Sequence, residues 1–312
     1  MVFTSVGDGG AVNVRRGIPL ALGAGVLFGL SAPLSKLIVA GMDPIALAGV
    51  LYLGAFAAVS VGRLLGVTRG LQSEPLRRSD MPYVIAMITI GGIMAPVLLM
   101  FGVRAASGFT ASLLLNLEGV TTALIAWMFF KERVSGAVWG AVALMTMTGV
   151  LLTGVTTGGR SSMIGPLLIM GAAIGWGVDN NVSARLSRCD PLILVSIKGL
   201  AAGLFSLGLS WATRGGLPAP TNLLAGLGVG CISYGVSLVL FILSLKVMGA
   251  ARTGAFFAVG PLAGALLSLV IFRSPFTWSM AVALVLTAAS IALVASEGLR
   301  TDGRQRADQL TD

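Results

Sequence analysis

Three ionisable side chains lie inside long apolar stretches of the sequence. Glu118 interrupts "LLLNLEGVTTALIAW", Asp179 lies in "IGWGVDNNVSARL", and Lys198 lies in "LVSIKGLAAG". An ionisable group at the centre of an apolar helix in lipid costs ~2.5–3.5 kcal/mol, so such residues usually face a polar cavity, a partner or a pathway. Their types indicate charge recognition or proton transfer.

Glu118 is the deepest of the three. Helical spacing places Thr121 and Thr122 on its face and turns Asn116 roughly the other way. The sequence therefore predicts a polar slot in which Glu118 either binds a cationic group or gains and loses a proton. The alternative is a protonated glutamic acid that donates to a backbone carbonyl and does nothing else.

Asp179 and Lys198 belong to successive apolar stretches and lie at a similar depth. We expect them to pair, since opposite charges lower each other's cost of burial, and Asn180 adds a polar group beside Asp179. The alternative is that Lys198 extends to the membrane surface and Asp179 reaches interfacial water. Aromatic side chains near this region are candidate walls of a binding cavity, with packing or lipid contact as the alternative: Trp176, Phe256 and Phe257.

Several other chemistries lack their usual residues. Histidine is absent, and Cys189 and Cys231 are the only cysteines, so no metal site, disulfide framework or cofactor is expected. No glycine-rich phosphate loop and no carboxylates paired at helical spacing occur, which argues against an enzyme. The net charge of +9 comes from scattered bases rather than a basic stripe, so no nucleic acid partner is expected.

The composition is that of a membrane protein. Of the 312 residues 56% are apolar and 11% are charged, and the mean hydropathy is +0.94, whereas a soluble domain has about 25% charged residues. A membrane-spanning helix needs ~20 mostly apolar residues. We predict an all-α membrane protein with ten transmembrane helices, at approximately 17–39, 44–66, 82–103, 107–130, 135–155, 163–184, 191–213, 221–245, 250–272 and 277–296.

The distribution of basic residues predicts the orientation. With a cytoplasmic N-terminus, most of the 21 Lys and Arg residues fall on the inner side, as the positive-inside rule describes. Lys198 falls within the membrane, and the bases on the outer side are Lys36, Arg104, Arg160, Arg214 and Arg273. Both termini are therefore predicted to be cytoplasmic, and the polar tail 298–312 is expected to be disordered. The first apolar run could instead be read as a cleaved signal peptide.

The two halves of the chain repeat each other, which argues for retention of that first run. "RAASGFTASLLLNLEGVTTALIAWMFFKERVSG" from Arg104 aligns without gaps with "KVMGAARTGAFFAVGPLAGALLSLVIFRSPFTW" from Lys246. "FG" at 28–29 matches "WG" at 176–177, and "DP" at 43–44 matches "DP" at 190–191. Because each repeat holds five helices, an odd number, the second is predicted to enter the membrane from the opposite side. Inverted repeats are typical of secondary transporters, whose sites lie near the midplane between the repeats.

These features together resemble the drug/metabolite transporter superfamily, and specifically a chain of two EamA-type repeats. The resemblance rests on the two five-helix halves, on "KER" closing the fourth helix and on "GAARTGAFFAVGPLAGALLSLVIF" in the ninth. It implies repeats at 17–156 and 163–297, followed by the cytoplasmic tail, in a multi-pass protein of the inner or plasma membrane. It also implies passage of small metabolites, amino-acid-like or drug-like, through a central cavity.

Two other function classes stay open at this point: an intramembrane enzyme, and a structural or signalling membrane protein that does not transport. The expected partners are a small-molecule substrate and the lipid bilayer, and a homodimer is left open.

Overall fold

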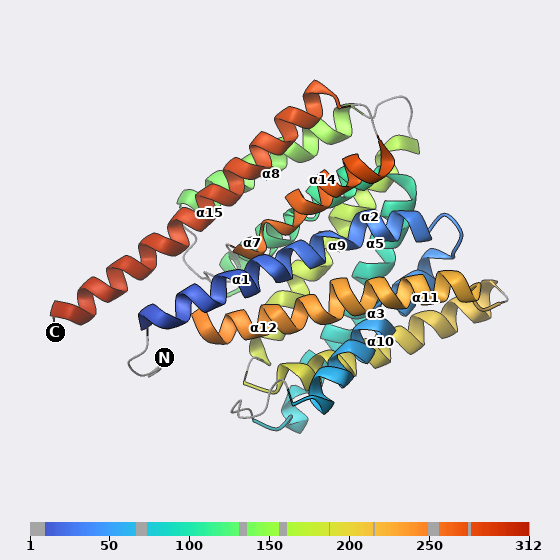
Figure 1. Ribbon diagram of the computed structural model, residues 1–312, viewed down its shortest axis with the longest axis horizontal. Helices are drawn as coiled ribbons and strands as arrows, with labels where there is room; N and C mark the ends of the chain where they lie inside the picture. Colours follow the sequence, from blue (N-terminus) through green and yellow to red (C-terminus); the bar gives the residue numbers. More distant parts are fainter. Residues whose placement is uncertain are drawn as a thin grey trace.

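The computed structural model describes residues 10–66, 74–130, 136–155, 161–186, 188–214, 216–248, 256–273 and 276–311. Throughout these ranges the regular structure is helical, and the only extended contact is an isolated bridge between Glu74 and Cys189. The helices form an elongated bundle, with α8 and α15 along one edge and α3 and α10 along the opposite edge (Figure 1).

The helices of the first half and of the second half follow one another in a similar order. The first half contains α1 (Gly10–Gly29), α2 (Ser31–Ile38), α3 (Pro44–Leu64), η1 (Arg78–Asp80), α4 (Met81–Ala86), η2 (Met87–Met94), α5 (Ala95–Ala105), α6 (Gly108–Leu114), α7 (Leu117–Phe130) and α8 (Gly136–Val155). The second half contains α9 (Ser161–Arg185), α10 (Pro191–Arg214), α11 (Pro220–Val229), η3 (Gly230–Val236), α12 (Ser237–Met248), α14 (Gly260–Phe272) and α15 (Trp278–Thr311). Here η1 is a 3-10 helix, and η2 and η3 are π-helical.

Seven helical stretches within the described residues are long and apolar enough to cross a membrane. They are Gly17–Val39, Pro44–Leu64, Arg78–Ala105, Gly108–Phe129, Met163–Ser183, Leu192–Arg214 and Pro220–Phe241. Three shorter apolar helices, Trp139–Thr148, Gly260–Phe272 and Trp278–Leu293, fall in the other predicted segments. The prediction of an all-α, multi-span protein is therefore confirmed.

The two repeated Asp-Pro pairs start the two helices that pack most extensively. Asp43 accepts hydrogen bonds from the backbone N–H groups of Ile45 and Ala46, at 3.1 and 3.2 Å, and Asp190 accepts one from Leu192 at 2.8 Å. An Asp N-cap followed by Pro satisfies the free amides at a helix start. The resulting helices, α3 and α10, pack along each other, with Gly49 facing the backbone of Gly203.

Close approach of glycines also joins the first helix to the ninth predicted segment. Gly25 and Gly29 of α1 face the backbone of Phe257 and Gly260, and Gly264 of α14 faces the carbonyl of Gly29. Any side chain at Gly29 or Gly260 would overlap the opposite backbone. The Gly-xxx-Gly pairs are therefore packing surfaces, which let helix backbones approach closely.

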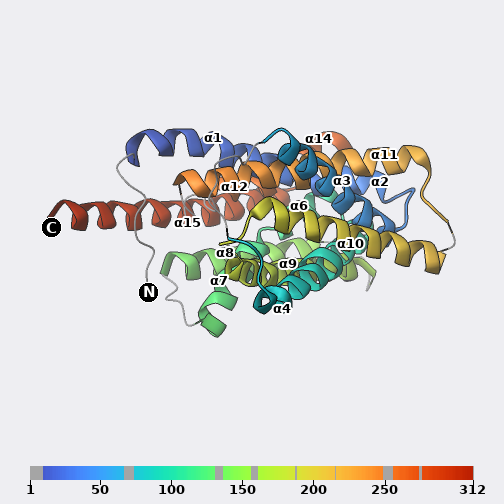
Figure 2. The ribbon, with the colours of Figure 1, turned by 90° about the horizontal axis from the view of Figure 1, so that it is seen from below.

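The packing partners of one half match those of the other half. α5 of the first half packs on α9 of the second half, and α12, the counterpart of α5, packs on α1, the counterpart of α9. The counterparts α6 and α14 pack on each other, as do the counterparts α8 and α15. The beginning of α1 and the end of α15 lie at the same end of the bundle (Figures 1 and 2).

The structure corrects the predicted segments in three respects. The segment 17–39 is divided at Leu30, and the segment 107–130 is divided by a turn at Leu115–Asn116, so neither is one continuous α-helix. The segments 82–103 and 221–245 each contain a π-helical stretch. The tail continues α15 to Thr311 instead of being disordered, because a helix that is already nucleated is extended at little cost.

Candidate functional site

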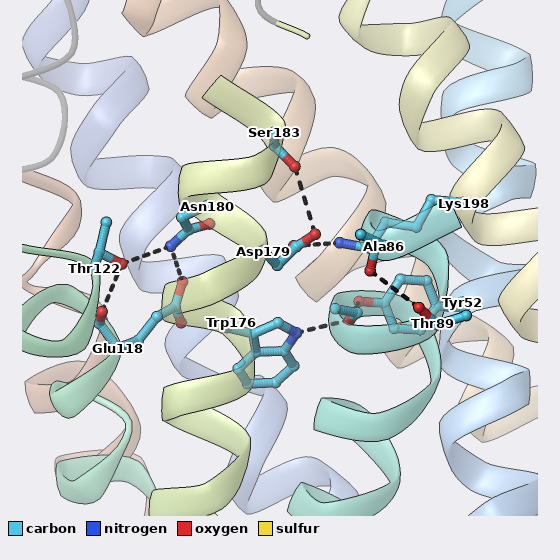
Figure 3. Close-up of polar contacts among 11 residues, drawn as sticks. Tyr52, Ala86, Thr89, Glu118, Thr122, Trp176, Asp179, Asn180, Ser183 and Lys198 are labelled. Carbon is cyan, nitrogen blue, oxygen red and sulfur yellow. Dashed lines mark hydrogen bonds and ion pairs between the residues drawn. The ribbon is translucent and has the colours of Figure 1, made fainter. Parts of the chain in front are cut away.

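Glu118 lies in the first turn of α7, directly after the break at Leu115–Asn116. The helix dipole favours a negative charge at this position. The Oε1 atom of Glu118 accepts a hydrogen bond of 3.0 Å from Nδ2 of Asn180, which also donates to Oγ1 of Thr122 at 3.1 Å (Figure 3). Asn180 thus joins Glu118 and Thr122 of the first half to α9 of the second half.

The other polar groups of α7 connect it to α9. The Thr121 hydroxyl donates to the carbonyl of Ala173 at 2.9 Å, and Asn181 donates to the carbonyl of Thr122 at 3.0 Å. Gly177 leaves the room that the Thr121 side chain occupies. Thr122 therefore lies next to the Glu118 carboxylate as expected, whereas the Thr121 hydroxyl holds the two helices together.

Asp179 and Lys198 form the expected ion pair. Nζ of Lys198 lies 2.5 Å from Oδ2 of Asp179, and the two side chains are 13% (Lys198) and 7% (Asp179) exposed. Ser183 lies 3.5 Å from the other carboxylate oxygen, one turn along α9 (Figure 3). The prediction of a pair is confirmed, and the alternative in which Lys198 extends to the surface is wrong. Breaking such a pair from one side leaves an uncompensated buried charge.

Two buried donors from different helices meet at one carbonyl. The Tyr52 hydroxyl donates to the carbonyl of Gly91 at 2.7 Å, and the Trp176 indole N–H donates to the same oxygen at 2.9 Å. The Lys198 ammonium lies 5.9 Å from the centre of the Tyr52 ring. Tyr52 and Gly91 therefore belong to the cluster around the ion pair, although neither was among the predicted site residues.

The aromatic side chains form a connected group. Trp176 meets Phe28 edge to face at 6.2 Å, and Phe28 lies 5.4 Å from Phe257, which lies 4.9 Å from Phe241. Phe257 and Phe256 are half-buried, directly before the turn that precedes α14. The structure thus brings Trp176 and Phe257 into one group through Phe28, which is the counterpart of Trp176 in the repeat.

Glu118, Asp179 and Lys198 are connected through neighbouring residues of α9. Glu118 accepts its hydrogen bond from Asn180, the residue that follows Asp179 on α9, and Asp179 makes its ion pair with Lys198. Among the residues that the structure describes, Glu118 has no cationic side chain within ion-pair distance. Over the same residues, no three of His, Cys, Asp and Glu gather as metal ligands. The arrangement suits reversible recognition of a cation or a proton.

Further charged contacts lie at helix ends, away from this group. Arg188 pairs with Asp80 and with Glu74, and its hydrogen bond to the Asp80 carboxylate raises the pKa of the Arg188 guanidinium. Arg214 lies 3.5 Å from Asp43 at the end where α3 starts and α10 finishes. These contacts hold connecting segments to helix termini and are too far along the helices to belong to the Glu118 group.

The fold and these polar contacts define a multi-span helical membrane protein with an ionisable group between its two halves. The EamA-like transporter family model matches residues 15–155 and 163–296, and the chain belongs to that family. The protein is therefore a membrane transporter.

Individual relatives agree with this assignment. A protein named "Uncharacterized transporter" from Methanothermobacter thermautotrophicus is 29% identical over 273 residues, which cover 81% of this chain and 78% of the relative. A solved crystal structure is similar with a TM-score of 0.67 and 19% identity, and the match covers 91% of this chain and 98% of that one. At that identity the likeness concerns the fold alone.

Proposed function

We propose that the protein is a secondary transporter that moves small amino-acid-like or drug-like metabolites across the inner membrane by alternating access. Ten transmembrane helices would form two inverted five-helix repeats, with both termini in the cytoplasm. The matched Asp-Pro starts, the matched π-helical stretches and the equivalent packing pairs α5–α9 and α12–α1 support this arrangement. The start of α1 and the end of α15 lie at the same end of the bundle, which agrees with it.

The hydrogen bond between Glu118 and Asn180 is the observation that carries the proposal. It joins the fourth predicted helix of the first repeat to the first predicted helix of the second, and the carboxylate has no ion-pair partner among the described side chains. Substrate sites of inverted-repeat transporters lie between the repeats. A carboxylate in that position can bind a substrate ammonium group or carry a proton.

The substrate site would comprise the polar group and its aromatic neighbours. Glu118 and Thr122 would meet the substrate together with Asn180, while the Asp179–Lys198 pair would set the charge beside them. Zwitterions such as amino acids suit this mixture of one free carboxylate and one neutralised pair. The remaining members of the proposed site are Thr121, Trp176, Phe256 and Phe257.

Uptake by proteoliposomes tests the function. Purified protein reconstituted into liposomes should accumulate labelled members of a panel of amino acids and drug-like amines, with and without an imposed pH gradient. Liposomes without protein are the control for leakage. Accumulation of no panel member above that control would contradict the proposed substrate class.

Thiol labelling tests the proposed topology. The charge bias predicts the segment 67–80 inside and the segment 156–162 outside, and residues 67–73 and 156–160 lie outside the described part of the chain. Single cysteines in place of Ser73 and Ser161, in a background lacking Cys189 and Cys231, should differ in intact cells. An impermeant thiol reagent should label the Ser161 site alone, and labelling of the Ser73 site would contradict the ten-helix arrangement with a cytoplasmic N-terminus.

A further inference from the structure

The carbonyl of Gly91 has lost its partners within its own helix. The N–H of Ala95 donates to the carbonyl of Ile90, in the spacing of a π-helix, and Pro96 has no N–H to offer. A proline inside a helix also clashes with the preceding turn, which a π-helical stretch relieves. The sequence "GGIMAP" therefore leaves one buried carbonyl that must find its donors elsewhere.

The donors come from two other helices. Tyr52 of α3 and Trp176 of α9 are 7% and 5% exposed, and both donate to the Gly91 oxygen. Their hydrogen bonds fix the π-helical turn against α9 at the level of Asp179 (Figure 3). The absence of a side chain at Gly91 matters here, because a Cβ atom would overlap the Asp179 carboxyl group.

The second half of the chain provides an internal comparison. The alignment that matches the repeats places Phe28 opposite Trp176, Gly199 opposite Tyr52, and Leu238 opposite Pro96. η3 occupies the same region as η2, yet the proline is absent and neither Phe28 nor Gly199 has a side chain that can donate a hydrogen bond. The two donors thus accompany the proline in the first half, and all three are missing together in the second.

We propose that Tyr52 and Trp176 are positioning residues, which hold the π-helical turn at Gly91 so that Asp179 and Lys198 pair across it. If the turn reverted to α-helix, the residues beyond it would rotate by about 100° relative to α9. A neighbouring residue with a larger side chain would then take the place of Gly91 opposite Asp179. Asp179 would then lose the space that it occupies. The Tyr52 ring supports the same pair from the other side, through its contact with the Lys198 ammonium.

Reactivity of the Lys198 amine tests this role without any transport measurement. The reconstituted protein is treated with a membrane-permeant amine reagent, and modification of Lys198 is followed by mass spectrometry with Lys36 as an internal reference. Tyr52→Phe and Trp176→Phe each leave one donor on the Gly91 oxygen, so each should change Lys198 labelling by less than about two-fold. The double variant strands the carbonyl and should raise labelling about ten-fold, well above the product of the single effects.

Three further variants make the test specific. Gly91→Ala places a methyl group on Asp179 and should raise Lys198 labelling to the level of the double variant. Tyr234→Phe removes the hydroxyl of another buried tyrosine, whose ring lies 5.6 Å from that of Tyr52, and should leave labelling unchanged because the Gly91 oxygen keeps both donors. Pro96→Ala supplies an N–H for the Gly91 carbonyl and should lower the labelling of the double variant, and it should also improve folding if the double variant is recovered poorly.

These outcomes are distinct from those that test the proposed function. The positioning role concerns the Asp179–Lys198 pair itself, and only the relevance of this cluster to transport rests on the proposed function. Unchanged Lys198 labelling in the double variant or in Gly91→Ala would overturn the positioning role. Single effects that simply multiply would also overturn it, since they would reflect loss of packing alone. A lower melting temperature without increased Lys198 labelling would mean that the hydrogen bonds support the fold and not the ion pair.

Discussion

Lys198→Met is expected to reduce the yield of folded protein severely, because it leaves the Asp179 carboxylate buried without its counter-charge. Removal of one partner of a buried ion pair costs about 3–5 kcal/mol, and Asp179→Asn should cost a similar amount by stranding the ammonium group. The distance of 2.5 Å and the low exposure of both side chains place this pair in that class. The fraction recovered as a single species in mild detergent, together with its melting temperature, measures the effect.

The double variant Asp179→Asn/Lys198→Met separates pairing from independent roles. With both charges removed no charge is stranded, so the combined loss should be clearly smaller than the sum of the single losses. Ser183→Ala is the matched control, because it removes only the 3.5 Å contact to the same carboxylate and should change stability little. Strictly additive losses would show that the two charges do not depend on each other.

Glu118→Gln is expected to change transport while the protein remains folded. Glutamine keeps the shape of the side chain and can still bond to Asn180, but it cannot hold a negative charge or titrate. If Glu118 cycles a proton, the variant should lose the dependence of transport on a pH gradient and still exchange substrate. If the carboxylate binds a substrate amine, affinity for amines should fall at every pH, by about ten-fold or more for a lost charge-assisted hydrogen bond.

The control for Glu118→Gln is Thr122→Val, which removes the neighbouring hydroxyl that shares Asn180 but leaves the carboxylate. That variant should retain pH-dependent transport with a modest change in affinity. Equal pH dependence in wild type and Glu118→Gln, together with equal affinity for amines, would contradict both proposed roles of the carboxylate.

The sequence was sufficient for features that depend on local pattern. Apolar runs of sufficient length predicted the helical segments, and the predicted segments 44–66 and 191–213 begin at the prolines with which α3 and α10 start. Counting residues from Pro191 placed Lys198 at the depth of Asp179, so their pairing could be predicted without knowing the packing.

Features that depend on contacts between distant helices were not predictable in the same way. The partner of Glu118 is 62 residues away on α9, and nothing in the periodicity of either helix specifies which of them pack together. Tyr52 was overlooked because a single tyrosine in an apolar helix resembles an ordinary core residue. Pro96 inside an apolar helix was the available signal, since it implies a backbone carbonyl without its helical donor, and the π-helical stretch makes that carbonyl the one of Gly91.

Substrate uptake by proteoliposomes that contain well-folded Glu118→Leu protein tests most directly whether Glu118 serves transport. Leucine has similar bulk but neither charge nor proton, so it removes both proposed roles while filling the same space. This variant is expected to lose pH-gradient-driven uptake and most substrate exchange, at equal protein density and with a melting temperature close to that of wild type. Wild-type uptake rates with wild-type pH dependence would contradict the central claim that Glu118 serves transport.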